Sequence, residues 1–163
     1  MKYHYSNSQL ISLTFLRVLI GWHFLYEGLA KLFDPAWSAK PYLSGAIGPL
    51  APLFKNMANN EAILRFADVL NEWGLILIGL GLFIGLFAKP AKIFGIILLS
   101  FYYLSYPPFA GLGINEHVEG TYWIVNKNLI EMAALLILVF FPTSHITGID
   151  RFFLKTKRQA VKA

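Results

Sequence analysis

The stretch RVLIGWHFLYEGLAKL, residues 17–32, decides the fold, because it combines four ionisable side chains with a mostly apolar helical sequence. The four are Arg17, His23, Glu27 and Lys31. The apolar residues around them extend toward the roughly 20 positions that a helix needs to cross a bilayer. The stretch therefore predicts a membrane-spanning helix with one polar face.

The whole chain has the composition of a membrane protein. It has 163 residues, of which 56% are hydrophobic and 16% aromatic, well above the values of soluble domains. Four segments are long and apolar enough to be predicted as spans: 10–32, 69–87, 91–106 and 122–141. We therefore expect an all-α fold, an integral membrane four-helix bundle forming a single domain. The first segment is too long and too polar for a signal peptide, so we expect it to remain in the protein.

The first loop carries a further helical pattern. After the turn signal Asp34-Pro35, the segment NEAILRFADVLNEWG, residues 60–74, alternates apolar and charged residues with a helical period. This pattern predicts a short amphipathic helix that lies on the outer interface and runs into the second span.

Charged residues predict the orientation. The tail, residues 150–163, is basic, and the tight second loop carries Lys89 and Lys92, whereas the third loop, SYPPFAGLGINEHVEGTYW, has no Lys or Arg. Because basic residues near span ends stay cytoplasmic, both termini are expected inside the cell, with the chain in the inner membrane. The net charge of +5 fits anionic lipid headgroups. No motif indicates nucleic-acid binding.

The ionisable residues of the first span share one side of the helix. His23, Glu27 and Lys31 are four residues apart, and Arg17 lies about 40° from Lys31 around the axis. A charge at mid-membrane depth costs at least about 2.5 kcal/mol unless it faces a cavity, a partner or the bundle interior. We therefore expect this side of the helix to face inward.

Polar residues of the other spans reach the same depth when the first helix runs outward. We predict a polar site in the outer half of the bundle, with a core of Glu27, Lys31, Asn128 and Glu131 and with Tyr102 beside it. A purely structural alternative stays open. In it, Lys31 and Lys127 reach the outer headgroups, Arg17 reaches inner phosphates, and Glu27 bonds Lys31 along the helix.

Several cofactors are disfavoured by the residues. The chain has no cysteine, which excludes disulfides, Cys-ligated zinc and iron–sulfur clusters. A haem held by two histidines needs a partner for His23 at its own depth, whereas His4, His117 and His145 lie near span ends or in a loop. We expect no metal site and no covalently bound cofactor, and any electron carrier must be borrowed.

A sparse set of residues resembles the DoxX/DoxD family of four-helix membrane proteins over residues 12–151. The set consists of Arg17, Gly21, Phe24, Gly28 and Lys31, Glu72-Trp-Gly, Gly81-Leu-Phe with Lys89, Lys127-Asn128-Leu129, and Gly148-Ile-Asp150. DoxD members are the small subunit of a thiosulfate:quinone oxidoreductase, and the NKNLIE stretch with Glu131 is similar to that branch.

The resemblance implies a subunit of a quinone-linked membrane oxidoreductase. In this hypothesis Arg17, Lys31, Asn128 and Tyr102 bind a quinone headgroup or a small anion. Proton transfer is assigned to the candidates Glu27, Glu131 and His23. The expected partners are membrane lipids and either a second redox subunit or further copies of the chain.

Two other hypotheses remain. Glycine stripes at Gly21 and Gly28, and at Gly74, Gly81 and Gly85, fit close helix packing and a non-catalytic membrane scaffold that binds a partner protein. A small transporter is less favoured, because the sequence shows neither an internal repeat nor paired broken helices.

Overall fold

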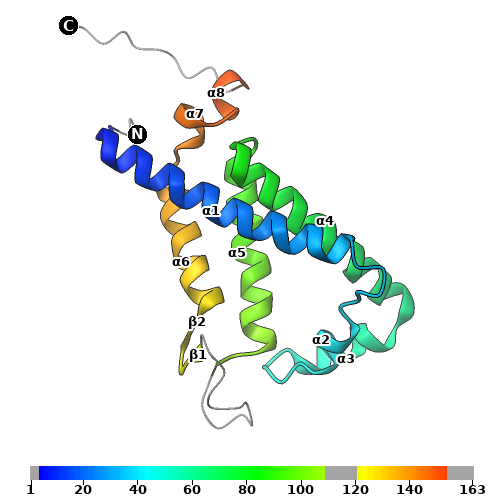
Figure 1. Cartoon of the computed structure of the whole chain (residues 1–163). Coiled ribbons are helices and arrows are strands. Elements are labelled where there is room, and N and C mark those ends of the chain that lie inside the picture. The colour runs from blue at the N-terminus through cyan, green and yellow to red at the C-terminus, as the bar shows by residue number, and fades with distance from the viewer. Residues whose placement is uncertain (1–3, 109–120, 154–163) are drawn as a thin grey trace, which may run out of the picture.

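The computed structural model describes residues 4–108 and 121–153, which form a mostly helical molecule (Figure 1). The long helices are α1 (Asn7–Leu32), α4 (Glu61–Ile84), α5 (Ala88–Ser105) and α6 (Lys127–Phe140). Short helices are α2 (Lys40–Ser44), α3 (Ala51–Asn59), α7 (Ser144–Thr147) and α8 (Asp150–Phe153). The two-residue strands β1 (Thr121–Tyr122) and β2 (Val125–Asn126) pair antiparallel directly before α6.

Local sequence signals define where the long helices begin. Ser6 and Gln9 form a reciprocal capping box at the start of α1. The side chain of Asn60 accepts hydrogen bonds from the backbone of Ala62 and Ile63 at the start of α4, and Asn126 accepts one from Leu129 in α6. These side chains satisfy backbone N–H groups that the first helical turn leaves free.

The long helices enclose one apolar core. Its buried residues come from each of them: Ile20 and Phe24, Leu75, Ile78 and Leu82, Ala91 and Leu99, and Leu135 and Leu138. The contacts of α1 are most extensive with α4, and α5 contacts both α4 and α6. A second apolar cluster joins α2 and α3 to the first turns of α4. It forms a small subdomain beyond one end of the core (Figure 1).

The structure confirms the mostly helical fold and corrects one boundary. The amphipathic segment predicted to run into the second span is the first part of α4, which is continuous from Glu61 to Ile84. Residues 122–126, predicted as the start of the last span, belong to the β1–β2 hairpin and its turn, so α6 has only 14 residues. The centre of the third predicted loop, residues 109–120, and the tail, residues 154–163, lie outside the described residues.

Two helices, α1 and α4, are long and apolar enough to cross a membrane within the described part of the chain. At 1.5 Å per residue, α5 is about 27 Å long and α6 about 21 Å. A typical hydrocarbon core is about 30 Å thick.

Candidate functional site

A cavity of about 270 Å³ lies between α1, α4, α5 and the start of α6. The segment between α1 and α2 closes it from the side of the subdomain. Phe24, Leu75 and Leu99 form its apolar part. The polar and aromatic residues that line it are His23, Glu27, Lys31, Trp37, Ser38, Tyr42, Asn71, Tyr102, Lys127 and Asn128.

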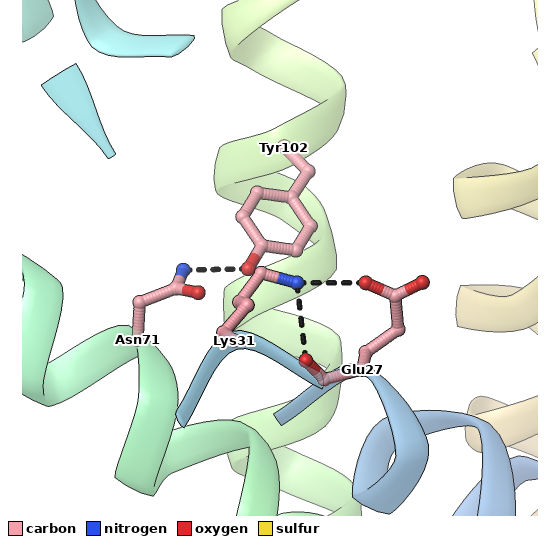
Figure 2. A network of polar contacts seen from close by, with 4 residues as sticks. All are labelled: Glu27, Lys31, Asn71 and Tyr102. Carbon is pink, nitrogen blue, oxygen red and sulfur yellow. Dashed lines mark hydrogen bonds and ion pairs between the residues drawn. The ribbon is translucent and has the colours of Figure 1, made fainter. Parts of the chain in front are cut away.

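The Glu27–Lys31 pair forms the charged part of the wall. Lys31 Nζ lies 2.7 Å from Glu27 Oε2 and 3.4 Å from the backbone oxygen of Glu27 (Figure 2). The ammonium also lies 5.8 Å from the centre of the Trp37 ring, within the range of a cation–π contact. The two opposite charges balance each other on one turn of α1. The carboxylate can still accept, and the ammonium can still donate, further hydrogen bonds to a ligand.

Opposite this pair, Asn71 of α4 and Tyr102 of α5 are joined by a hydrogen bond. Asn71 Nδ2 donates to the Tyr102 hydroxyl over 2.6 Å, and side chains from the three helices point toward one another (Figure 2). Asn71 Oδ1 is buried and has no hydrogen-bond partner within residues 4–108 and 121–153. The wall therefore contains an unused acceptor beside a hydroxyl whose own proton remains available for donation.

The segment before α2 is fixed to α4 by Asp68. Its two carboxylate oxygens accept hydrogen bonds from the Ser38 hydroxyl at 3.0 Å and from the Ala39 backbone at 2.7 Å. Helix α2 then presents Tyr42, whose hydroxyl donates to the Tyr102 backbone oxygen at 3.3 Å. Burial raises the pKa of Tyr42, so this phenol stays protonated and serves as a donor at neutral pH.

His23 connects α1 to α6. Its Nδ1 lies 2.8 Å from Glu131 Oε1. Glu131 does not line the cavity itself, but it is one hydrogen bond away, because His23 is part of the wall. This contact joins residues 108 positions apart in the sequence.

The structure brings most of the predicted site residues together, and only Arg17 lies apart from them. Glu27, Lys31, Asn128, Tyr102 and His23 line the cavity, with Glu131 directly behind His23. Sequence reasoning did not identify Trp37, Tyr42 or Asp68, which belong to a turn-rich segment and to a part of α4 predicted to lie outside the core. The only available signal was Asp68 with Asn71, an i, i+3 pair of polar residues on one side of a helix.

Arg17 does not join the cavity, which corrects its predicted place beside Lys31. Its side chain is 2% exposed and lies against Gly85 and the segment before α8, where a Cβ on Gly85 would overlap the guanidinium. Lys92 is buried nearby and donates to the Leu138 backbone oxygen at 2.8 Å. The Nε and Nη1 atoms of Arg17 have no hydrogen-bond partner among the described residues.

Metal-ligating side chains do not gather in groups of three or more anywhere in the described ranges. Comparison of the chain with known protein families, curated proteins and solved structures finds no match. The chemistry of the cavity must therefore be argued from its own residues.

Proposed function

We propose that the protein is a four-span integral membrane protein of the DoxX/DoxD type and a subunit of a quinone-linked oxidoreductase. In this proposal the cavity beside Glu27 and Lys31 holds the quinone headgroup. The observation that carries the proposal is the wall itself, in which aromatic rings, hydrogen-bond donors and the Glu27–Lys31 ion pair surround one small cavity, with Glu131 behind His23.

The outer surface supports the membrane assignment. Large apolar side chains point away from the core on each long helix, among them Phe15, Trp22, Leu77, Phe94, Ile130 and Phe140. Exposed large apolar side chains on every long helix fit contact with lipid or with another protein. Basic residues near the α4–α5 turn and after α7 favour a cytoplasmic location for that end of the molecule.

The size and lining of the cavity fit a ring-sized ligand. Sites for drug-sized molecules usually begin at roughly 300 Å³, so a cavity of about 270 Å³ suits a single ring more than a larger molecule. Trp37, Tyr42 and Tyr102 offer flat surfaces against which a quinone ring can stack.

A bound quinone supplies two-electron, two-proton redox chemistry. The residues of the wall suit both of its forms: Lys31, Asn128 and the Tyr102 hydroxyl can donate to carbonyl oxygens. The unused Asn71 Oδ1 can accept from a hydroxyl of the reduced form. Glu27, and Glu131 through His23, are placed to hold or release protons at the wall.

The electrons must come from another component, because the chain has no thiol. We assign their release to a partner subunit that oxidises a reduced sulfur anion. Joining two thiosulfate ions into one tetrathionate releases two electrons. The quinone takes up these two electrons, together with two protons from the aqueous phase, and becomes a quinol. In this division of labour the present chain supplies the quinone site and its protons.

Carboxylate and tyrosine variants test the proposal in the native membrane complex. Glu27→Gln and Glu131→Gln should abolish quinone-linked turnover while expression is preserved. Tyr102→Phe should weaken quinone binding about tenfold, the value of one lost hydrogen bond of roughly 1.5 kcal/mol. Glu61→Gln, on the exposed start of α4, is the matched control. Unchanged turnover in both carboxylate variants would contradict the site.

The scaffold hypothesis rests on glycine stripes, of which Gly74 has nothing within 4 Å of a Cβ and three others face neighbouring helices. Gly21 faces the backbone of Phe83, Gly28 faces Ile76, and Gly81 faces Ala91, so these glycines pack against other helices of the same chain. They are not an unused surface for a partner protein. A partner chain copurifying without any bound quinone would still favour the scaffold over the redox subunit.

A further inference from the structure

His23 belongs both to the cavity wall and to the outer surface. It lines the cavity, yet its side chain is 44% exposed, whereas its partner Glu131 is only 12% exposed. The residue lies in the middle of α1, far from either end of the helix. We call this part of the lining, where the side chain that borders the cavity is itself exposed, the thin wall.

The thin wall lies at the seam between α1 and α6. Helix α1 packs extensively on α4 but contacts α6 far less, and it crosses the nearly parallel α5 and α6 obliquely (Figure 1). Among the described residues, hydrogen bonds on this side of the molecule include that of His23 with Glu131 and that of the Tyr5 hydroxyl with the Pro142 backbone oxygen at 3.2 Å.

A second, open groove occupies the other end of the same seam. It measures about 650 Å³ and lies between the first turns of α1 and the last turns of α6. Ile137 and Phe141 form its apolar side on α6, and Leu13 adds an apolar side chain on α1. The rest of the α1 side is lined by His4, Tyr5, Ser8, Gln9 and Ser12. Along α6, the ten residues from Glu131 to Phe141 span about 15 Å, so the groove begins within reach of the thin wall.

We infer that the cavity takes a lipid-borne quinone whose isoprenoid tail leaves between α1 and α6 at the His23–Glu131 pair and lies in the groove along this seam. The inference rests on the proposed function and adds the route of entry and the class of substrate. A polar ring at one end and a flexible apolar chain at the other match the polar groups of the cavity and the apolar α6 side of the groove. A small anion has no apolar chain that could occupy the groove.

The structure offers a closely matched pair of positions for a test. Ile137 lines the groove, and its neighbour Leu136 does not. The two side chains are similarly exposed, at 47% and 49%. Ile137→Trp fills the groove without entering the core, and Leu136→Trp adds the same bulk to the adjacent surface. Neither residue belongs to the cavity.

Binding is measured in lipid nanodiscs with quinones that share one ring and carry zero to several isoprene units. Quinone concentration is expressed per mole of lipid, so that partitioning into the bilayer does not imitate affinity. In the wild type, affinity should rise with tail length. Ile137→Trp should weaken binding of the long-tailed quinone about tenfold or more and leave the tailless ring unaffected, and Leu136→Trp should change neither.

The outcomes separate the two proposals. If the ring binds but tail length and Ile137→Trp have no effect, the quinone site stands and the seam route is overturned. If native mass spectrometry shows a phospholipid in the groove that Ile137→Trp removes while tail length has no effect, an acyl chain is the occupant and the inference fails. If no quinone binds at all, the proposed function itself fails.

Discussion

Asp150 connects the start of α8 to the turn between α4 and α5. Its carboxylate accepts hydrogen bonds from the backbone of Phe87 at 2.8 Å and of Ala88 at 3.2 Å, and its own N–H donates to the Gly85 oxygen at 2.9 Å. Phe87 has a φ of 49°, a conformation that non-glycine residues seldom adopt. The distant carboxylate thus stabilises the turn at which α5 begins.

His145 of α7 lies close to this region and is half-buried. Desolvation lowers its pKa below 6.5, the positive charge of Lys92 lowers it further, and Asp150 opposes the shift. The folded protein therefore favours the neutral imidazole. The unfolded chain binds more protons as the pH falls, so the folded state loses stability in that range.

We expect the stability contribution of His145 to be complete above about pH 6.5 and to decrease as the pH falls from there toward its lower folded pKa. His145→Asn should flatten this part of the profile. The measurement is the midpoint of thermal unfolding in detergent between about pH 5 and pH 8. His4→Asn, at an exposed position, is the control. A steeper decrease at low pH in His145→Asn than in the wild type would contradict the assignment.

At the scale of elements, glycine lets α1 and α4 approach closely. A Cβ on Gly79 would meet the backbone nitrogen of Leu25 at 2.4 Å, and one on Gly21 would meet that of Phe83 at 2.5 Å. Gly74, on the same helix as Gly79, has nothing within 4 Å of a Cβ. The backbone contact, and not an apolar stripe alone, therefore sets how α1 crosses α4.

Gly79→Ala should destabilise the protein by about 1–3 kcal/mol, because the added methyl group forces two backbones apart. Gly74→Ala should be neutral or stabilising by up to about 1 kcal/mol, since alanine favours helix. Both are measured as thermal or denaturant unfolding followed by circular dichroism. Equal losses in the two variants would contradict the close approach of α1 and α4 at Gly79.

The glycines of α4 also show that helical periodicity did not predict which of them contacts another helix. Periodicity grouped Gly74, Gly81 and Gly85 on one side of the second span, but the glycine that contacts α1 is Gly79. Gly85 instead ends α4 with a φ of 71°. Spacing tells which residues share a side of a helix, whereas the neighbour that each side meets depends on packing.

At the scale of the whole molecule, the proposal of four spans fixes a pattern of accessibility. Lys55 in the subdomain and Tyr122 in the hairpin should lie outside the cell, and Lys89 in the α4–α5 turn should lie inside. The distribution of basic residues supports this orientation. With only α1 and α4 across the membrane, Lys89 and Tyr122 would instead lie on the same side.

The absence of native cysteine makes this pattern simple to measure. Single variants Lys55→Cys, Lys89→Cys and Tyr122→Cys are treated with a membrane-impermeant maleimide in whole cells and after lysis. Positions 55 and 122 should react in intact cells, and position 89 only after lysis. Reaction of position 89 in intact cells would reverse the orientation, and matching behaviour of positions 89 and 122 would reduce the number of spans.

By itself, the sequence determined the helical content and the ionisable side of α1. The capping residues Ser6, Asn60 and Asn126 begin their helices through local hydrogen bonds, although the spans were predicted to begin at residues 10, 69 and 122. These features depend on neighbours within a turn or two, and helical periodicity makes them readable. It also placed Glu27 beside Lys31, since both lie on adjacent turns of one helix.

Only the tertiary structure decided which of these residues meet. Arg17 shares the angular position of Lys31, but 14 residues of helix separate them by about 21 Å along the axis, so Arg17 lies near Gly85 and not in the cavity. Glu131 contacts His23 because α1 passes α6 at the level of these two residues. Contacts between distant segments follow from the crossing of helices, which close backbone packing sets and which no local spacing encodes.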